Sequence, residues 1–354
     1  MNISREHLEL LSQNFKNIDE TTKEIINLEA ILTLPKGTEH FLSDIHGEYE
    51  AFDHILRNGS GIIKEKLKEV FGNRLPKKDL NLLATIIYYP EEKLNLLRKE
   101  FDVCDYKEFQ KIILLRLLEV TQVAARKYTR SKVRKILPKD FKYIIEELLY
   151  KMQSSDKNEY YDRILENIIE LGAGDKFIIE LSLSIHKLII DHLHIVGDIY
   201  DRGPFPDKIM DRLLNYHSLD IQWGNHDILW MGAACGNDAC ICNVIRNNLK
   251  YGNVEILENA YGISLRPLML FGMSKYGIED GIHAALAAIK VILFKLEGQL
   301  IKRHPEYGMN DRLLLEYLNL DKGTVTIDGV ETKLKTNVFP TVDKDNPYKL
   351  TDEE

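Results

Sequence analysis

Apolar residues recur at helical spacing at the start of the chain and again through a long central stretch. Over residues 4–32, leucine, isoleucine and phenylalanine return every three or four positions, which predicts one or two helices. Residues 48–57 predict a further short helix. From 60 to 190 the helical spacing continues almost throughout, so this stretch is predicted to be a helical insertion or cap. Within it, the polar run Met152–Tyr160 predicts a loop.

Three short runs are typical of buried strands, and each stops at a polar turn. Residues 39–43 lead into Asp44-Ile45-His46-Gly47, residues 191–196 into Gly197-Asp198, and residues 219–223 into Gly224-Asn225-His226-Asp227. Each run is therefore predicted to be a strand that presents polar side chains at its carboxyl end.

The remaining pattern predicts the order of the elements. Helices are predicted over 206–216, 227–250 and 281–302, and a hairpin over 324–334 around Asp328-Gly329. The resulting order is strand, helices, strand, helix, strand, helix. That order predicts an α/β layered core with a helical subdomain inserted after the first strand.

The same pattern predicts a division of the chain into three parts. Residues 1–59 would begin the core, residues 60–190 would form the helical insertion, and residues 191–354 would continue the core, which looks incomplete at its end. We found no internal repeat and no low-complexity tract in the sequence.

Composition and charge narrow the class of protein. The chain has 354 residues, of which 44% are apolar and 29% charged, with a net charge of −8. A mildly acidic protein is a poor candidate for binding nucleic acid. Charged residues within the first ten positions exclude an ordinary signal core, and no apolar run approaches the roughly 20 residues that span a bilayer. We expect a cytoplasmic protein without a membrane partner.

The four cysteines are Cys104, Cys235, Cys240 and Cys242. The last three form a C-x4-C-x-C pattern, which leaves a metal site open, but no matching second group of cysteines accompanies it. We interpret the cysteines as small buried apolar residues in helices. Their scarcity fits a reducing compartment.

The polar turns at the three predicted strand ends suggest a metal-dependent hydrolase. Open α/β sheets bind their ligands at the carboxyl ends of strands. Hydrolysis of a phosphoester needs a strong nucleophile and relief of negative charge, and two divalent ions roughly 3.5–4 Å apart provide both. Mixed oxygen and imidazole ligands suit manganese, iron or zinc better than magnesium alone.

Each polar side chain has a plausible role in such a site. Asp44 and His46, two positions apart, could face one ion, Asp198 could bridge two ions, and Asn225 offers a neutral oxygen ligand.

The other polar side chains suit the phosphate and the leaving group. Arg202 offers a fork for a phosphate. His226 is placed to protonate a leaving alkoxide, with Asp201 fixing its tautomer.

The three motifs Asp-x-His, Gly-Asp-x-x-Asp-Arg-Gly and Gly-Asn-His-Asp resemble those of the calcineurin-like metallophosphoesterases. The chain is similar to the N-terminal half of class III fructose-1,6-bisphosphatase of bacteria in two respects. These are the long helical stretch between Asp44 and Asp198 and the amino-acid sequences of residues 192–210 and 216–237. This resemblance implies a calcineurin-like metallophosphoesterase sandwich, present in part, with a large helical insertion. It also implies manganese-dependent hydrolysis of the 1-phosphate of fructose 1,6-bisphosphate, a sugar bisphosphate substrate, in gluconeogenesis.

The resemblance carries residue roles to matching positions. It implies metal ligands at Asp44, His46, Asp198 and Asn225, and it implies phosphate or proton-transfer roles for Arg202 and His226.

The sequence departs from the superfamily pattern downstream of His226. Further histidines normally complete the site, but only His283 and His304 follow, and both are predicted to lie at helix ends. Residues 351–354 read as a capping box, the signal of a helix start. We therefore expect a fragment, and the missing C-terminal half could act as a second chain. A homo-oligomer also stays open, as does the activity of the chain alone.

Other functions remain open at this point. A protein phosphatase or dinucleoside-polyphosphate hydrolase of the same superfamily would carry similar motifs, but normally keeps the first two close together. An inactive interaction remnant is the other alternative. The basic run Arg126–Lys135 is interpreted as a solvated or internally paired helix face, with a site for phosphorylated ligands or an effector, or for nucleic acid, as the alternatives. His192 and His194 are interpreted as structural or supporting groups.

Overall fold

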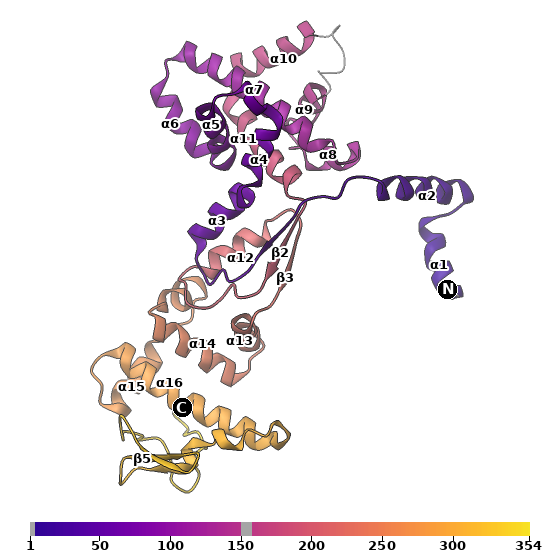
Figure 1. The fold of residues 1–354 in the computed structure, drawn as a ribbon. Coiled ribbons are helices and arrows are strands. Elements are labelled where there is room, and N and C mark those ends of the chain that lie inside the picture. Colours follow the sequence, from indigo (N-terminus) through magenta and orange to yellow (C-terminus); the bar gives the residue numbers. More distant parts are fainter. Residues whose placement is uncertain (1–3, 150–157) are drawn as a thin grey trace. The chain divides into compact units, whose positions relative to one another are not determined.

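The computed structural model describes residues 4–149 and 158–354 and has an α/β fold in which helices predominate (Figure 1). The chain divides into two compact units, residues 1–40 with 54–193 and residues 41–53 with 194–354. The predicted α/β class is therefore confirmed. The predicted loop Met152–Tyr160 lies outside the described residues as far as 157, and from Asn158 onward the chain is helical.

The first unit is mostly helical in its described part. Its helices are α1 (Arg5–Asn14), α2 (Ile18–Leu32), α4 (Ile62–Phe71), α5 (Lys77–Tyr88), α6 (Pro90–Glu100), α7 (Val103–Ala125), α8 (Arg130–Ile136), α9 (Lys142–Leu149), α10 (Asn158–Glu170) and α11 (Gly174–Ile189). The predicted helices over 4–32 are confirmed, and so is the predicted helical stretch from 60 to 190 where the structure describes it, up to 149 and from 158.

One continuous apolar core holds α4–α11 together. Leucine and isoleucine residues at helical spacing fill it, with Leu114, Leu117 and Phe177 fully buried. Asp102 starts α7, because its carboxylate accepts the backbone N–H groups of Cys104 and Asp105. By contrast, α1 and α2 contain no buried residue.

The basic run of the first unit is partly paired within the chain. Lys132 forms an ion pair with Asp191, and Arg134 forms one with Glu146. Lys127 donates a hydrogen bond to the carbonyl oxygen of Ile189 at 3.1 Å. Three of the basic side chains are thus used internally, as the interpretation of a paired helix face expects.

The second unit contains the motif-bearing loops. Its elements are parts of β1 (Glu39–Leu42), α3 (Tyr49–Asn58) and β2 (His192–Val196), followed by α12 (Pro206–Leu214), β3 (Leu219–Gln222), α13 (Asn225–Ala234), α14 (Asp238–Tyr251), α15 (Arg266–Tyr276), α16 (Gly281–Arg303), β4 (Leu318–Asn319), β5 (Thr324–Ile327) and β6 (Val330–Lys333). The three predicted strands that precede the polar turns are confirmed.

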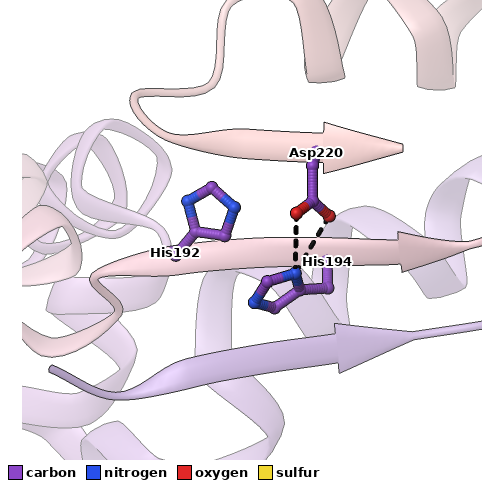
Figure 2. A group of neighbouring side chains, drawn as sticks. All are labelled: His192, His194 and Asp220. Carbon is purple, nitrogen blue, oxygen red and sulfur yellow. Dashed lines mark hydrogen bonds and ion pairs between the residues drawn. The ribbon is translucent and has the colours of Figure 1, made fainter. Parts of the chain in front are cut away.

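Two small sheets are present among the described residues. The first has the strand order β1-β2-β3, and its strands run in the same direction (Figure 2). The second has the order β4-β5-β6 and is antiparallel. Asp328 and Gly329 both have positive φ between β5 and β6, which is the geometry of a two-residue hairpin turn. The predicted hairpin is confirmed.

Helix α16 is the central element of the end of the chain. Asp280 starts it by accepting the backbone N–H of His283, and its apolar face packs with α14 and α15 in one core. Lys295, in the same helix, is fully buried and donates to Glu354 and to the carbonyl oxygen of Thr341, each at 2.6 Å. The predicted capping box at Thr351 and Glu354 is formed by two hydrogen bonds between these residues.

One prediction for the second unit is wrong in detail, and one helix was missed. The helix predicted over 227–250 is broken into α13 and α14, because Gly236 has a φ of +82° and Asn237 caps the second helix. Helix α15 was not predicted at all.

The cysteine interpretation also needs correction. Cys242 is buried, but Cys104, in the first turn of α7, and Cys235, which follows the last residue of α13, are exposed. None of the described helices is both long and apolar enough to cross a bilayer.

Candidate metal centre

Backbone hydrogen bonds join the loop after β1 to the loop after β2. The N–H of His46 donates to the carbonyl oxygen of Asp198 at 2.8 Å, and the N–H of Gly47 donates to that of Ile199 at 2.9 Å. In return, the N–H of Gly203 donates to the carbonyl oxygen of His46 at 2.7 Å. The first two sequence motifs are therefore locked together through their main chains.

Glycines allow these loops to pass this closely. A Cβ atom at Gly203 would lie 2.1 Å from the carbonyl oxygen of His46, which no side chain can tolerate. A Cβ atom at Gly224 would lie 2.2 Å from Oδ1 of Asp198. The glycine of each motif is thus needed for contact between the loops, which brings the third motif against the second.

Asp44, His46 and Asp198 form a compact group of potential metal ligands. Their ligand atoms all lie within 4.8 Å of one another. All three residues have positive φ, between 50° and 54°, a conformation that non-glycine residues adopt uncommonly. Such backbone conformations cluster at functional sites, where the surrounding structure holds them.

The donor set of this group fits a divalent ion. Two carboxylates and one imidazole supply the mixed oxygen and nitrogen ligands that manganese, iron or zinc accept. Asp44 is exposed and His46 is half-buried, so an ion and its substrate could reach the group from solvent. Asn225 is the first residue of α13 and follows Gly224, whose backbone touches Asp198.

Asp201 lies between the other two predicted site residues. One of its carboxylate oxygens is 3.3 Å from Nδ1 of His226, and the other accepts Nε of Arg202 at 2.8 Å. Asp201 is almost completely buried, whereas Arg202 is exposed and His226 half-buried. The hydrogen bond and charge of Asp201 raise the pKa of Arg202 above its ordinary value.

Asp227 organises two of the loops, and sequence reasoning gave it no role. It is buried, and its two carboxylate oxygens accept the backbone N–H groups of Tyr200 at 2.9 Å and Gly224 at 2.8 Å. Its place at the third position of α13 is a helix-capping signal that could have revealed this. Asn253 was also missed, and its side chain donates to the carbonyl oxygen of Arg202.

A second group of potential ligands lies on the sheet itself. His192 and His194 of β2 and Asp220 of β3 bring their ligand atoms within 4.8 Å of one another (Figure 2). Nδ1 of His194 is 2.9 Å from Asp220, and the ring of Phe41 stacks on that of His194 at 4.3 Å. These contacts already occupy His194 with neighbours in the sheet.

His283 and His304 lie where the sequence predicted them. His283 is in the first turn of α16 and His304 follows its last residue. Each is paired with a nearby carboxylate, Asp280 and Glu306 respectively.

Comparisons with known proteins point to one family. Residues 6–354 match a family model described as firmicute fructose-1,6-bisphosphatase. A class 3 fructose-1,6-bisphosphatase of Listeria monocytogenes is 52% identical over 373 residues, which cover 99% of this chain and 57% of that relative. One of Clostridium beijerinckii is 53% identical, covering 98% of this chain and 55% of the relative. The chain thus spans little more than half the length of these relatives. No solved structure matches the chain.

Proposed function

Because the chain belongs to the firmicute fructose-1,6-bisphosphatase family, we propose that it carries the metal-binding loops of an enzyme that hydrolyses the 1-phosphate of fructose 1,6-bisphosphate. The products would be fructose 6-phosphate and inorganic phosphate, in gluconeogenesis in the cytoplasm. The single observation that carries this proposal is the convergence of Asp44, His46 and Asp198 at the ends of neighbouring strands.

The proposed metal is manganese, held by Asp44, His46, Asp198 and Asn225, with other divalent ions as substitutes. When bound, it would neutralise phosphate charge and lower the pKa of a coordinated water. Two carboxylates and an imidazole whose ligand atoms lie within 4.8 Å of one another support this assignment, because manganese accepts mixed oxygen and nitrogen ligands.

The remaining residues would bind the phosphate and deliver a proton. Arg202 is exposed, and its guanidinium, held by Asp201 through Nε, would bind incoming phosphate oxygens. Because Nδ1 of His226 faces Asp201, Nε2 of the same ring is available to give a proton to the leaving alkoxide. Asp201 would hold His226 in the tautomer that this transfer needs.

We extend the proposal to the fold. The parallel order β1-β2-β3 with motif residues at the strand ends supports part of a calcineurin-like metallophosphoesterase sandwich. In this view residues 1–59 and 191–354 form the core, and residues 60–190 form the helical insertion. Since the chain spans little more than half of its relatives, we propose that a polypeptide equivalent to the remainder takes part in the activity.

Phosphate release from a panel of substrates tests this function. The purified chain, alone and co-expressed with the unmatched part of the Listeria monocytogenes relative, would be incubated with Mn²⁺ and fructose 1,6-bisphosphate, a phosphopeptide or a dinucleoside polyphosphate. We expect release from the sugar bisphosphate, lost on chelation of the metal and in the variant His226→Gln. Release from only the phosphopeptide or the dinucleotide would assign a different phosphatase, and release from none would favour an interaction remnant.

A further inference from the structure

A large apolar hollow opens on the second unit beside the candidate metal centre. Its volume is about 620 Å³, and its wall includes Met210 of α12, Ile221 and Trp223 at the end of β3, Trp230 of α13, and Tyr261. These elements all belong to the second unit, so the hollow is a feature of that unit alone.

The chemistry of the wall does not suit a sugar phosphate. Among the described residues, Asp227 is the one charged side chain in the wall, and both of its carboxylate oxygens accept backbone N–H groups. The hydroxyl groups of Tyr200 and Tyr261 bond to each other at 2.8 Å. A phosphorylated ligand would lose its hydration here without gaining donors, whereas apolar side chains would gain by leaving water.

Large apolar side chains surround the hollow and face solvent. The exposed fractions are 60% for Trp223, 51% for Met231 and 41% for Ile221. Contiguous apolar surface of this kind marks an interaction site in a folded protein.

Strand β3 adds a second feature to the same surface. It is the last strand in the order β1-β2-β3 of the described residues, and three of its four residues are exposed. The edge of a sheet can be extended by a further strand from another polypeptide.

We propose that this surface seats a polypeptide equivalent to the part of the curated relatives that the chain does not span. The relatives are longer by a stretch equal to 43% of the Listeria monocytogenes protein, since this chain covers 57% of it. That stretch would add a strand to β3 and place apolar side chains in the hollow. The inference rests on the proposed function and names the partner of its site.

Seating this polypeptide would also stabilise the candidate metal centre. Tyr200 lies between Asp198 and Asp201 in sequence, and Trp223 precedes the third motif. Both side chains line the hollow. Filling the hollow fixes the side chains that anchor these loops. Affinity for Mn²⁺ should therefore rise when the polypeptide is bound.

Tryptophan fluorescence tests the docking without any assay of catalysis. Trp223 and Trp230 are the two tryptophans of the protein, and both line the hollow. The unmatched part of the Listeria monocytogenes relative would be titrated into the purified chain, with phenylalanine in place of any tryptophan that it contains. In a second experiment the two polypeptides would be co-expressed and purified together. We expect a saturable blue shift, a one-to-one complex, and protection of the β3 amides from hydrogen exchange.

Matched variants locate the docking surface. Met231→Glu, at the rim of the hollow, should weaken binding at least about tenfold, because an unpaired charge would be buried. Leu270→Glu, at an equally exposed apolar position of α15, should leave binding unchanged. Both side chains are exposed, so both variants should fold.

Several results would overturn the docking proposal. The first is the absence of a complex on both titration and co-expression. The second is equal weakening of binding by Met231→Glu and Leu270→Glu. The third is self-association of the chain that Met231→Glu abolishes, which would identify a second copy as the occupant. A complex that binds as expected yet releases no phosphate would contradict the proposed function and leave the docking surface standing.

Discussion

The helical core of the first unit and the region around β3 and α13 of the second unit use apolar residues in opposite ways. In α4–α11 the apolar residues form one continuous core, in which Leu114 and Phe177 are fully buried. Around β3 and α13 large apolar side chains such as Trp223 remain exposed. The motif loops are held by backbone hydrogen bonds and glycine contacts. The first unit therefore depends on packing, and the metal centre depends on backbone geometry.

The largest expected effect comes from the packed core. Phe177→Ala removes a fully buried ring that packs on Phe141 at 4.8 Å, and should lower the free energy of unfolding by about 3–5 kcal/mol. Urea unfolding followed by circular dichroism measures this. Because the substitution lies in the first unit, Mn²⁺ binding by the second unit should persist in mild conditions. Simultaneous loss of metal binding would show that the two units do not act separately.

The second largest effect concerns the buried ion pair of the second unit. Glu354→Gln leaves the charge of Lys295 buried without its counter-ion and should cost about 3 kcal/mol of stability. Replacing both residues, by Lys295→Met with Glu354→Leu, should recover most of this loss because no charge then remains buried. A double variant as unstable as the single one would contradict this account.

The same pair gives stability a pH dependence. Burial alone would raise the pKa of Glu354, but hydrogen bonds from Lys295 and the Thr351 backbone N–H outweigh it and lower the pKa below the ordinary 4.5. The carboxylate therefore contributes fully above pH 4.5, and its contribution is lost as pH falls through the lower folded value. Unfolding curves measured between pH 3 and 7 should show that the free energy of unfolding falls more steeply toward acid pH in the wild type than in Glu354→Gln.

A smaller effect is expected from the loop support. Asp227→Ala leaves the backbone N–H groups of Tyr200 and Gly224 without their acceptor, at a cost of about 1–3 kcal/mol. Asp227→Asn keeps one acceptor oxygen, so its stability should lie between that of Asp227→Ala and that of the wild type. Thermal unfolding measures the stability, and a Mn²⁺ titration should show weaker binding in the same order. Full metal affinity in Asp227→Ala would mean that the loops do not need this carboxylate.

The smallest effect is expected at the exposed surface. Trp223→Ala truncates an aromatic ring, as Phe177→Ala does, but the ring is 60% exposed, so stability should change by no more than about 0.5 kcal/mol. A large loss from Trp223→Ala would break the contrast between the two regions.

Local patterns predicted most elements because each carries its own signal. Apolar spacing predicted the helical stretch from 60 to 190, and Asp328-Gly329 predicted the hairpin. The break between α13 and α14 was missed because the apolar spacing continues across Gly236, and the exposure of Cys235 follows from that break.

The convergence at the candidate site was only partly visible in the sequence. The motifs indicated which side chains come together, since the ends of parallel strands meet. They did not reveal the role of Asp227 or the hydrogen bond from Asn253 to Arg202, because both depend on how distant segments meet in space.

Manganese binding by the purified chain tests the central claim most directly. Electron paramagnetic resonance would follow free Mn²⁺ during titration of the wild type, of Asp198→Ala in the proposed centre, and of Asp220→Ala in the other ligand group. We predict that Asp198→Ala weakens binding at least about 100-fold, since loss of a ligand should match or exceed loss of a supporting group. Asp220→Ala should bind as the wild type does. Unchanged stoichiometry and affinity in Asp198→Ala, or loss of binding in Asp220→Ala, would contradict the account.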